Sequence, residues 1–75
     1  MTTADTVMDR ALALAGSDID TESAISELKE CCGDRRVPVV MARRHLMERL
    51  DGGTDERVGR AVVLLDELLL RLGDV

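Results

Sequence analysis

Phenylalanine, tyrosine and tryptophan are all missing from this chain of 75 residues, although 45% of the residues are hydrophobic. Aromatic side chains bury more area than other residues, so the core must be built from leucine, valine, isoleucine, methionine and alanine. A chain of this length is one domain, here residues 1–75, and buries only about 60% of the surface that its unfolded form exposes. We therefore expect either a very regular helical bundle or a core completed by association with another chain.

Long apolar runs and a targeting segment are missing as well. No unbroken apolar run is longer than residues 61–65, which is far short of the roughly 20 residues that a membrane span requires. No basic segment precedes an apolar stretch near the amino end, so we expect no signal peptide. Asparagine and glutamine are absent and arginine far outnumbers lysine, which is typical of a GC-rich bacterial genome. The sequence therefore predicts a soluble, cytoplasmic bacterial protein with no membrane association.

Positive charge is scarce overall but concentrated in one segment. The net charge is −5 at pH 7, so the whole molecule repels nucleic acid and anionic membranes. Between residues 35 and 49, however, there are five arginines and one glutamate. We interpret the arginines as a strip that faces acidic groups of this chain or of an acidic partner; the alternative is an anion-binding or nucleic-acid-binding strip. The strip consists of Arg35, Arg36, Arg43, Arg44 and Arg49.

Apolar residues recur at helical spacing in four segments, which predicts helices at about 4–15, 21–32, 38–50 and 55–72. No segment alternates apolar and polar residues for long enough to form a strand. The short connections imply antiparallel neighbours. We therefore predict an all-α fold, a small four-helix bundle whose longest helix is at the C-terminus and which packs further as an oligomer.

Capping residues and helix breakers set the expected boundaries. The residues expected to accept hydrogen bonds from the first-turn amides are Thr2 or Thr3, Asp20 and Thr54. Glycines are expected to end three of the helices, at Gly16, Gly33 and Gly73, and at Gly16 we expect a left-handed conformation. Pro38 suits a first turn, so we expect the third helix to begin there.

The last predicted helix carries apolar residues on two sides. One continuous arc of about 160° faces the core and consists of Val58, Ala61, Val62, Leu64, Leu65, Leu68, Leu69 and Leu72. On the opposite side, Val63 and Leu70 lie seven residues apart, beside Gly59 and Glu67. We interpret these four residues as an interface for self-association or for a partner helix. The alternative is that they are solvent-exposed or covered by the amino end of the chain.

Arg43 is the unusual residue of the third predicted helix, because it falls among inward-facing apolar positions. An unpaired charge there would cost several kcal/mol. Its side chain either extends to water along an aliphatic stem or meets a partner. The partner would be an acidic residue of another helix, an acidic residue across a subunit boundary, or a bound anion.

No residue pattern indicates catalysis, a metal or a cofactor. Cys31 and Cys32 are adjacent, so they project about 100° apart and do not form a CxxC motif. With His45 they offer too few spaced ligands for zinc. We expect both cysteines to pack as small core residues, with a regulatory or dimer-linking thiol as the alternative. His45 projects to the polar side, and no nucleophile or phosphate-binding motif accompanies it, so we expect no enzyme and no small-molecule substrate.

We therefore predict a non-enzymatic helical protein that acts through protein–protein association, as a homodimer or larger oligomer or as an accessory subunit. The alternative is a small DNA-binding regulator or antitoxin that uses the arginine-rich third helix in a helix-turn-helix. Leu28, Cys32 and Val39 fit that motif, whereas Lys29 and Asp34 depart from it. The acidic charge of the chain opposes approach to DNA.

Overall fold

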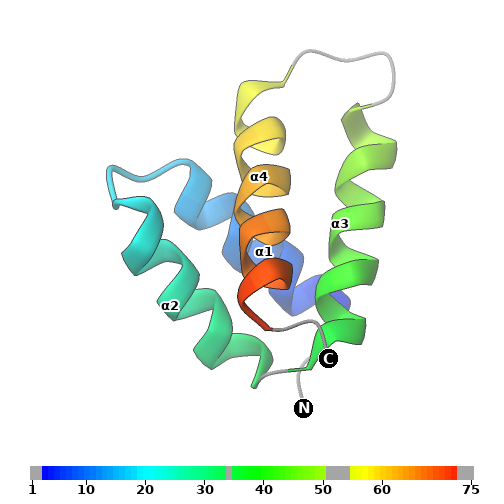
Figure 1. Cartoon of the computed structure of the whole chain (residues 1–75). Helices are drawn as coiled ribbons and strands as arrows, with labels where there is room; N and C mark the ends of the chain where they lie inside the picture. Colours follow the sequence, from blue (N-terminus) through cyan, green and yellow to red (C-terminus); the bar gives the residue numbers. More distant parts are fainter. Residues whose placement is uncertain (1–2, 34, 51–54, 73–75) are drawn as a thin grey trace.

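The computed structural model describes residues 3–33, 35–50 and 55–72 and shows four helices (Figure 1). These are α1 (Ala4–Ala15), α2 (Thr21–Cys32), α3 (Arg36–Leu50) and α4 (Glu56–Arg71). No strand occurs in these described ranges. The prediction of an all-α fold with four helices is confirmed, and α1 and α2 begin and end at the expected residues.

The third helix begins two residues earlier than expected, at Arg36, which places Pro38 at its third position. Proline is tolerated there because the first amide groups of a helix have no partner within it, so the missing N–H costs no hydrogen bond. With 15 residues, α3 is almost as long as α4, which has 16. The C-terminal helix is therefore the longest described one, as predicted, but only by a single residue.

Two of the expected N-caps are confirmed and the third is replaced. The Thr3 hydroxyl accepts from the amide of Thr6 at 3.2 Å, and the Asp20 carboxylate accepts from the amide of Ser23 at 3.2 Å. At α4 the cap is Asp55, whose carboxylate accepts from the amides of residues 57 and 58. We had expected Asp55 inside the first turn, with the cap at Thr54, which lies outside the described residues.

The two described glycines that follow helices behave differently. Gly33 ends α2 as expected, and it does so in the left-handed region, at φ 60°. Gly16 ends α1 at φ −89°, so the prediction of a left-handed residue is wrong there. The amide of Gly16 bonds the Leu12 carbonyl at 3.2 Å and that of Ser17 bonds Leu14, which closes the last turn without a positive φ. Gly73 lies outside the described residues.

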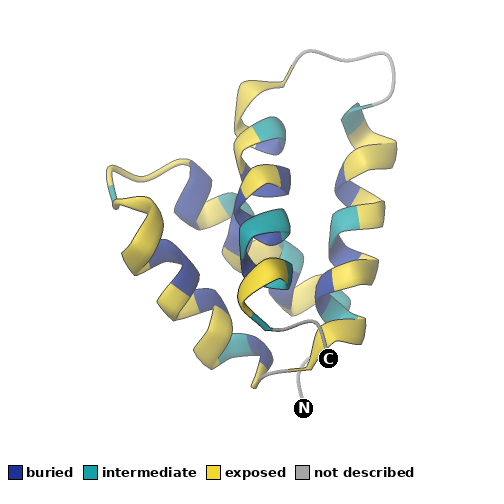
Figure 2. Ribbon diagram, viewed as in Figure 1, coloured by how far each residue is buried: buried dark blue, intermediate teal, exposed yellow. Residues whose placement is uncertain are grey.

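The core is made of aliphatic side chains and one thiol, and no polar or charged residue of the described chain is buried in it (Figure 2). The sequence-predicted arc of α4 faces this core. Six of its members are buried, and the last two are half-buried. The buried members are Val58, Ala61, Val62, Leu64, Leu65 and Leu68.

Helix α4 is the element on which the other three pack. It stands between α2 and α3 at the front of Figure 1, while α1 crosses behind it, and it contacts all three. Because its core-facing arc is occupied on three sides, only the front of α4 stays open to solvent. That open side is where the candidate surface lies.

Candidate interaction surface

The described residues include six large hydrophobic side chains that are exposed, and four of them belong to neighbouring edges of α3 and α4. On α4, Val63 is 59% exposed and Leu70 is 75% exposed. On α3, Val40 and Met47 are each nearly half exposed. We call these four side chains, together with the ion pair described next, the α3–α4 face.

The ion pair joins the two helices at the middle of this face. Nε of Arg43 on α3 donates to Oδ1 of Asp66 on α4. Val40 precedes Arg43 by three residues and Met47 follows it by four, so all three lie on one side of α3. Of the alternatives left open for Arg43, the structure therefore shows an acidic partner on another helix of the same chain.

The same spacing recurs on α4, where Val63 precedes Asp66 by three residues and Leu70 follows it by four. In Figure 1, α3 and α4 are neighbours and run in opposite directions. The last turns of α4 therefore lie beside the first turns of α3. In agreement, Leu70 and Arg36 line one shallow hollow of about 360 Å³ together with Asp66. The exposed aliphatic side chains of the two helices thus surround a paired, rather than a free, arginine.

Gly59 and Glu67, the other two members of the interface predicted from sequence, are both half-buried. A Cβ atom added to Gly59 would meet no atom within 4 Å, so nothing in the described chain requires a glycine at this helical position. Alanine is the better helix former by about 1 kcal/mol. The small residue therefore leaves a gap on the outer side of α4 that the fold itself does not use.

A bidentate ion pair marks the other edge of α4. Nη1 and Nη2 of Arg71 donate to the two carboxylate oxygens of Glu22 on α2, at 2.8 and 2.6 Å. These hydrogen bonds lower the pKa of Glu22 and raise the pKa of Arg71. Glu67, on the same helix as Arg71, also raises the pKa of Arg71. Both paired side chains are substantially exposed, so the pair orients the helices more than it stabilises them.

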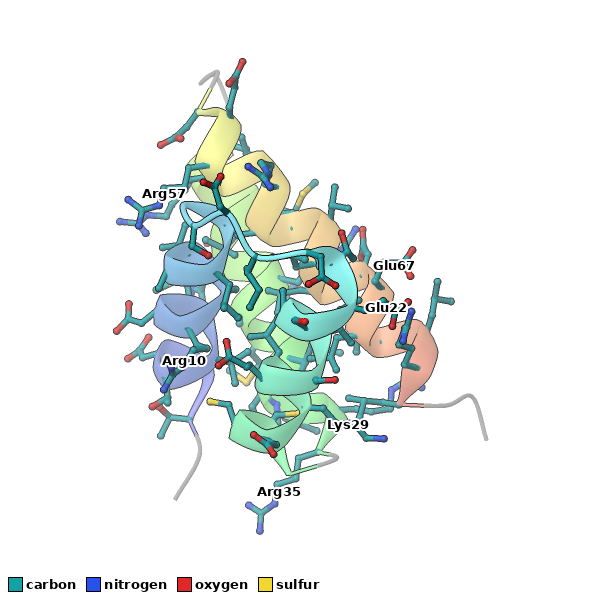
Figure 3. All side chains as sticks on the ribbon, turned by 90° about the vertical axis from the view of Figure 1, so that its left-hand side faces the viewer. Arg10, Glu22, Lys29, Arg35, Arg57 and Glu67 are labelled. Atoms are coloured by element: carbon teal, nitrogen blue, oxygen red, sulfur yellow. The ribbon has the colours of Figure 1, made fainter. Side chains whose placement is uncertain are left out.

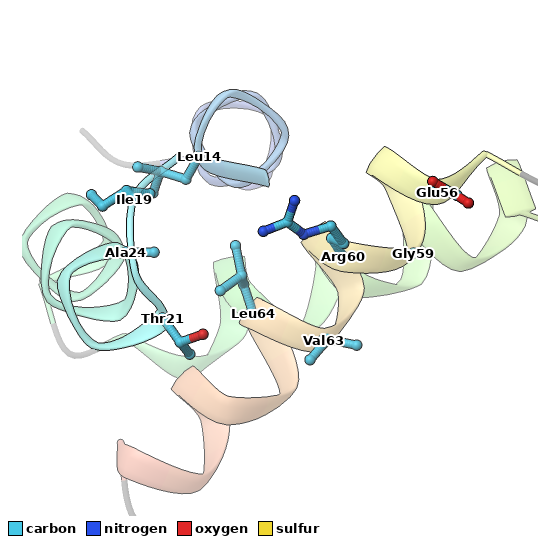
Figure 4. A pocket seen from close by; sticks show the side chains of 9 residues that line it. All are labelled: Leu14, Ile19, Thr21, Ala24, Glu56, Gly59, Arg60, Val63 and Leu64. Carbon is cyan, nitrogen blue, oxygen red and sulfur yellow. The ribbon is translucent and has the colours of Figure 1, made fainter. Parts of the chain in front are cut away.

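A hollow of about 610 Å³ opens between the first half of α4 and the turn from α1 to α2 (Figure 4). Arg60 and Leu64 point into it from α4, and apolar side chains form the opposite wall. Arg60 is exposed and has no hydrogen-bond or ion-pair partner within the described ranges. The opposite wall comprises Leu14, Ile19 and Ala24.

The structure does not bring the five arginines of the predicted strip onto one surface. Consecutive helical residues point about 100° apart, so Arg43 and Arg44 face different directions. Arg49 lies on a third side, where it lines a hollow together with Asp9 and Asp55. The strip members are exposed except for Arg43, which is half-buried. Those members are Arg35, Arg36, Arg43, Arg44 and Arg49.

The two cysteines and the histidine differ in how far they are buried. Cys32 is buried, and its thiol donates to the Lys29 carbonyl at 3.6 Å. Cys31 is half-buried and His45 is exposed on α3. Over residues 3–33, 35–50 and 55–72, no group of three or more histidine, cysteine, aspartate or glutamate side chains is placed to hold a metal ion.

A contact between α4 and the end of α1 is among those that the sequence does not predict. Nε of Arg57 on α4 donates to the Leu12 carbonyl at 2.9 Å, so a side chain from α4 caps the end of α1 (Figure 3). Gly16 makes room for it, because a Cβ there would lie 2.8 Å from that Nε atom. The residues are 45 positions apart, and no local pattern signals such a contact.

The described helices include none with both the length and the hydrophobicity needed to cross a lipid bilayer. The features that set this chain apart are those of its surface, above all the α3–α4 face and the gap at Gly59. Comparison with protein families, curated proteins and solved structures finds no match to this chain.

Proposed function

We propose that this protein has no enzymatic role and acts by binding another protein molecule through the α3–α4 face, as a homo-oligomer or as an accessory subunit. The observation that supports this is the gathering of four exposed aliphatic side chains on adjoining edges of two helices. Exposed apolar side chains that gather on one face of a small protein are typical of an interaction site. The patch consists of Val40, Met47, Val63 and Leu70.

The ion pair within the face is compatible with burial under a partner. A buried unpaired charge would cost several kcal/mol, which would oppose association. Arg43 and Asp66 are already paired, with side chains 38% and 47% exposed. A partner that covers them excludes water from two charges that compensate each other. The face can therefore be covered without leaving either group unsatisfied.

The magnitudes favour an interface that also uses polar contacts. Complete burial of one valine or leucine side chain yields about 1.5–3 kcal/mol, and these four are already partly covered. Their combined gain is on the order of several kcal/mol, whereas association costs about 4–15 kcal/mol in lost freedom. Charged groups at the edge of the patch must therefore supply further affinity or specificity.

The proposal includes a cytoplasmic bacterial setting, on the composition alone, and a protein rather than a nucleic-acid partner. The ion pair between Arg43 and Asp66 supports a protein partner, because a paired arginine is less available to bind the phosphates of DNA. The remaining arginines of α3 point in several directions and cannot all reach one DNA groove.

Site-specific photo-crosslinking in the native host tests this proposal. A photoreactive amino acid is placed at position 63, inside the face, or at position 41 as the matched control. Met41 is an exposed apolar residue of α3, but it precedes Arg43 by two residues and points away from the face. We expect a discrete adduct from position 63 and none from position 41.

The mass of the adduct separates the two forms of association. An adduct of twice the 8.2 kDa chain mass indicates a second copy, and another mass indicates a different protein. The proposal is wrong if position 63 gives no adduct, or if position 41 gives the same adducts with the same yield.

A further inference from the structure

We propose that the occupant of this surface is a second copy of the same chain, whose α4 packs antiparallel on α4 about a twofold axis near Val63. The inference rests on the proposed function and names its partner. The argument comes from the order of charges along the outer side of α4 and from the gap at Gly59.

Four charged residues follow one edge of α4 with alternating sign: Glu56, Arg60, Glu67 and Arg71. Their positions are symmetric about the midpoint between residues 63 and 64. When two such helices pack antiparallel about that midpoint, Arg60 lies opposite Glu67 of the second copy, and Glu56 lies opposite Arg71. Each contact occurs twice because of the twofold symmetry. The edge is therefore complementary to itself.

Other arrangements of the same two helices lose these contacts between opposite charges. A parallel pair in register exchanges the two edges, so Arg60 and Glu67 face the apolar edge of the second copy and meet no opposite charge. An antiparallel pair shifted by about one turn puts either Arg60 opposite Arg71 or Glu56 opposite Glu67. Like charges that face each other disfavour association. The alternating pattern therefore selects one direction and one register.

The apolar edge of α4 fits this register. A twofold axis perpendicular to the helices keeps each edge on its own side, so apolar residues of one copy meet apolar residues of the other. Val63 then lies against Val63 of the second copy. Leu70 lies within about 3 Å, along the axis, of Gly59 of the second copy. The open space at Gly59 receives this leucine and lets the helices approach closely.

The hollow beside α4 supports the same arrangement. Arg60 stands at its mouth with no partner in the part of the chain that the structure describes. In the proposed dimer, the carboxylate of Glu67 from the second copy lies beside this guanidinium and pairs with it. Hydrogen bonds between ionised groups are roughly twice as strong as neutral ones. Met47 of α3 lies on the apolar side, where it extends the contact beyond the two central helices.

The proposed contact between Arg60 and Glu67 of the second copy is tested by reversing each charge alone and then both together. Arg60→Glu and Glu67→Arg are made singly and together in the full chain, and dimerisation is measured by sedimentation equilibrium. Each single variant creates two repulsive contacts, so we expect its dimer dissociation constant to rise about tenfold or more. The double variant restores opposite charges across the axis, so its dissociation constant should return close to the wild-type value. Residues 60 and 67 lie about 10 Å apart along one helix, too far for rescue within a monomer.

Two controls show whether a change in dimerisation comes from net charge or loss of folding instead of from the proposed contact. Glu27→Arg on α2 makes the same change in net charge as Glu67→Arg, at an exposed position, and should leave dimerisation unchanged. Far-ultraviolet circular dichroism confirms that each variant is helical. Val63→Glu with Leu70→Glu should shift the protein to monomer.

The possible failures are distinguishable. A monomeric wild type at millimolar concentration overturns the self-pairing, whereas an adduct to a different protein from position 63 would keep the proposed function. The proposed register is wrong if the Val63/Leu70 double variant is monomeric while neither single charge reversal changes the dimer dissociation constant. A monomer that yields no adduct from position 63 overturns both proposals.

Discussion

Replacement of Gly59 by alanine should make the monomer more stable and the dimer weaker. Glycine within a helix is less favourable than alanine by about 0.5–1 kcal/mol, because the unfolded chain loses more freedom when it folds. The added Cβ atom meets no atom of the described chain within 4 Å, so no clash offsets this gain. We expect the free energy of unfolding to rise by about 0.5–1 kcal/mol, which is roughly 2–8 °C in Tm for a domain of this size. In the proposed dimer, however, the same methyl group occupies the space that receives Leu70.

The two effects are measured separately. Chemical unfolding is followed by circular dichroism at the lowest usable concentration, since the chain contains no aromatic residue to report by fluorescence. Dimerisation is followed by sedimentation equilibrium at higher concentration. Ala13→Gly, the reverse exchange at an exposed position of α1, serves as the control and should lower stability without changing dimerisation. A less stable Gly59→Ala monomer would refute the open-space reasoning, and unchanged or tighter dimerisation would refute the close approach of the helices.

Three further predictions follow from the core, the inter-helix ion pair and the thiols. Leu65→Ala removes a fully buried side chain and should cost about 2–5 kcal/mol of unfolding free energy in denaturant titration; a loss below about 1 kcal/mol would contradict its place in the core. Arg71 lowers the pKa of Glu22 in the folded protein. The contribution of this pair to the free energy of unfolding is therefore complete above the ordinary glutamate pKa of about 4.3, and it is lost as the pH falls through the lower folded-state pKa. Glu22→Gln should therefore be less stable than wild type at neutral pH, and the difference should disappear in acid unfolding titrations. A thiol reagent should modify one cysteine rapidly in the folded protein; Cys31→Ser should abolish that fast reaction, because Cys32 is only 1% exposed, and persistence of the fast phase would show that Cys32 is accessible.

The helices and their buried sides could be predicted because both follow from local spacing. Leu65 and Leu68 lie at the centre of an apolar arc that the 3.6-residue period places on one side, and they are fully buried. Val63 and Leu70 fall outside that arc and are exposed, which the same period explains. Sequence spacing is therefore sufficient to assign the inner and outer sides of α4.

The helix ends were predicted less well because several residues compete to define them. Asp55 and Thr54 are both good N-cap residues, and only the backbone conformation decides that Asp55 accepts the first-turn hydrogen bonds. Pro38 is compatible with any position in a first turn, so it limits the start of α3 without fixing it. Gly16 can adopt a left-handed conformation but is not obliged to.

The contacts between helices could not be predicted, since local spacing carries no information on how one helix slides along another. Arg43 required an acidic partner, but the chain contains many acidic residues. Only the packing of α3 on α4 selects Asp66. The same holds for Arg57 and the Leu12 carbonyl, because that contact depends on the crossing of α1 and α4.

The central position of α4 has a consequence for synthesis on the ribosome. Of the 17 buried apolar residues in the described chain, α4 supplies six, and it is translated after the three helices that pack on it. At about 5–20 residues per second, the nascent chain waits on the order of seconds between completion of α3 and emergence of α4. During that interval the apolar sides of α1, α2 and α3 have no fourth helix to cover them, so the core cannot close until α4 has been made.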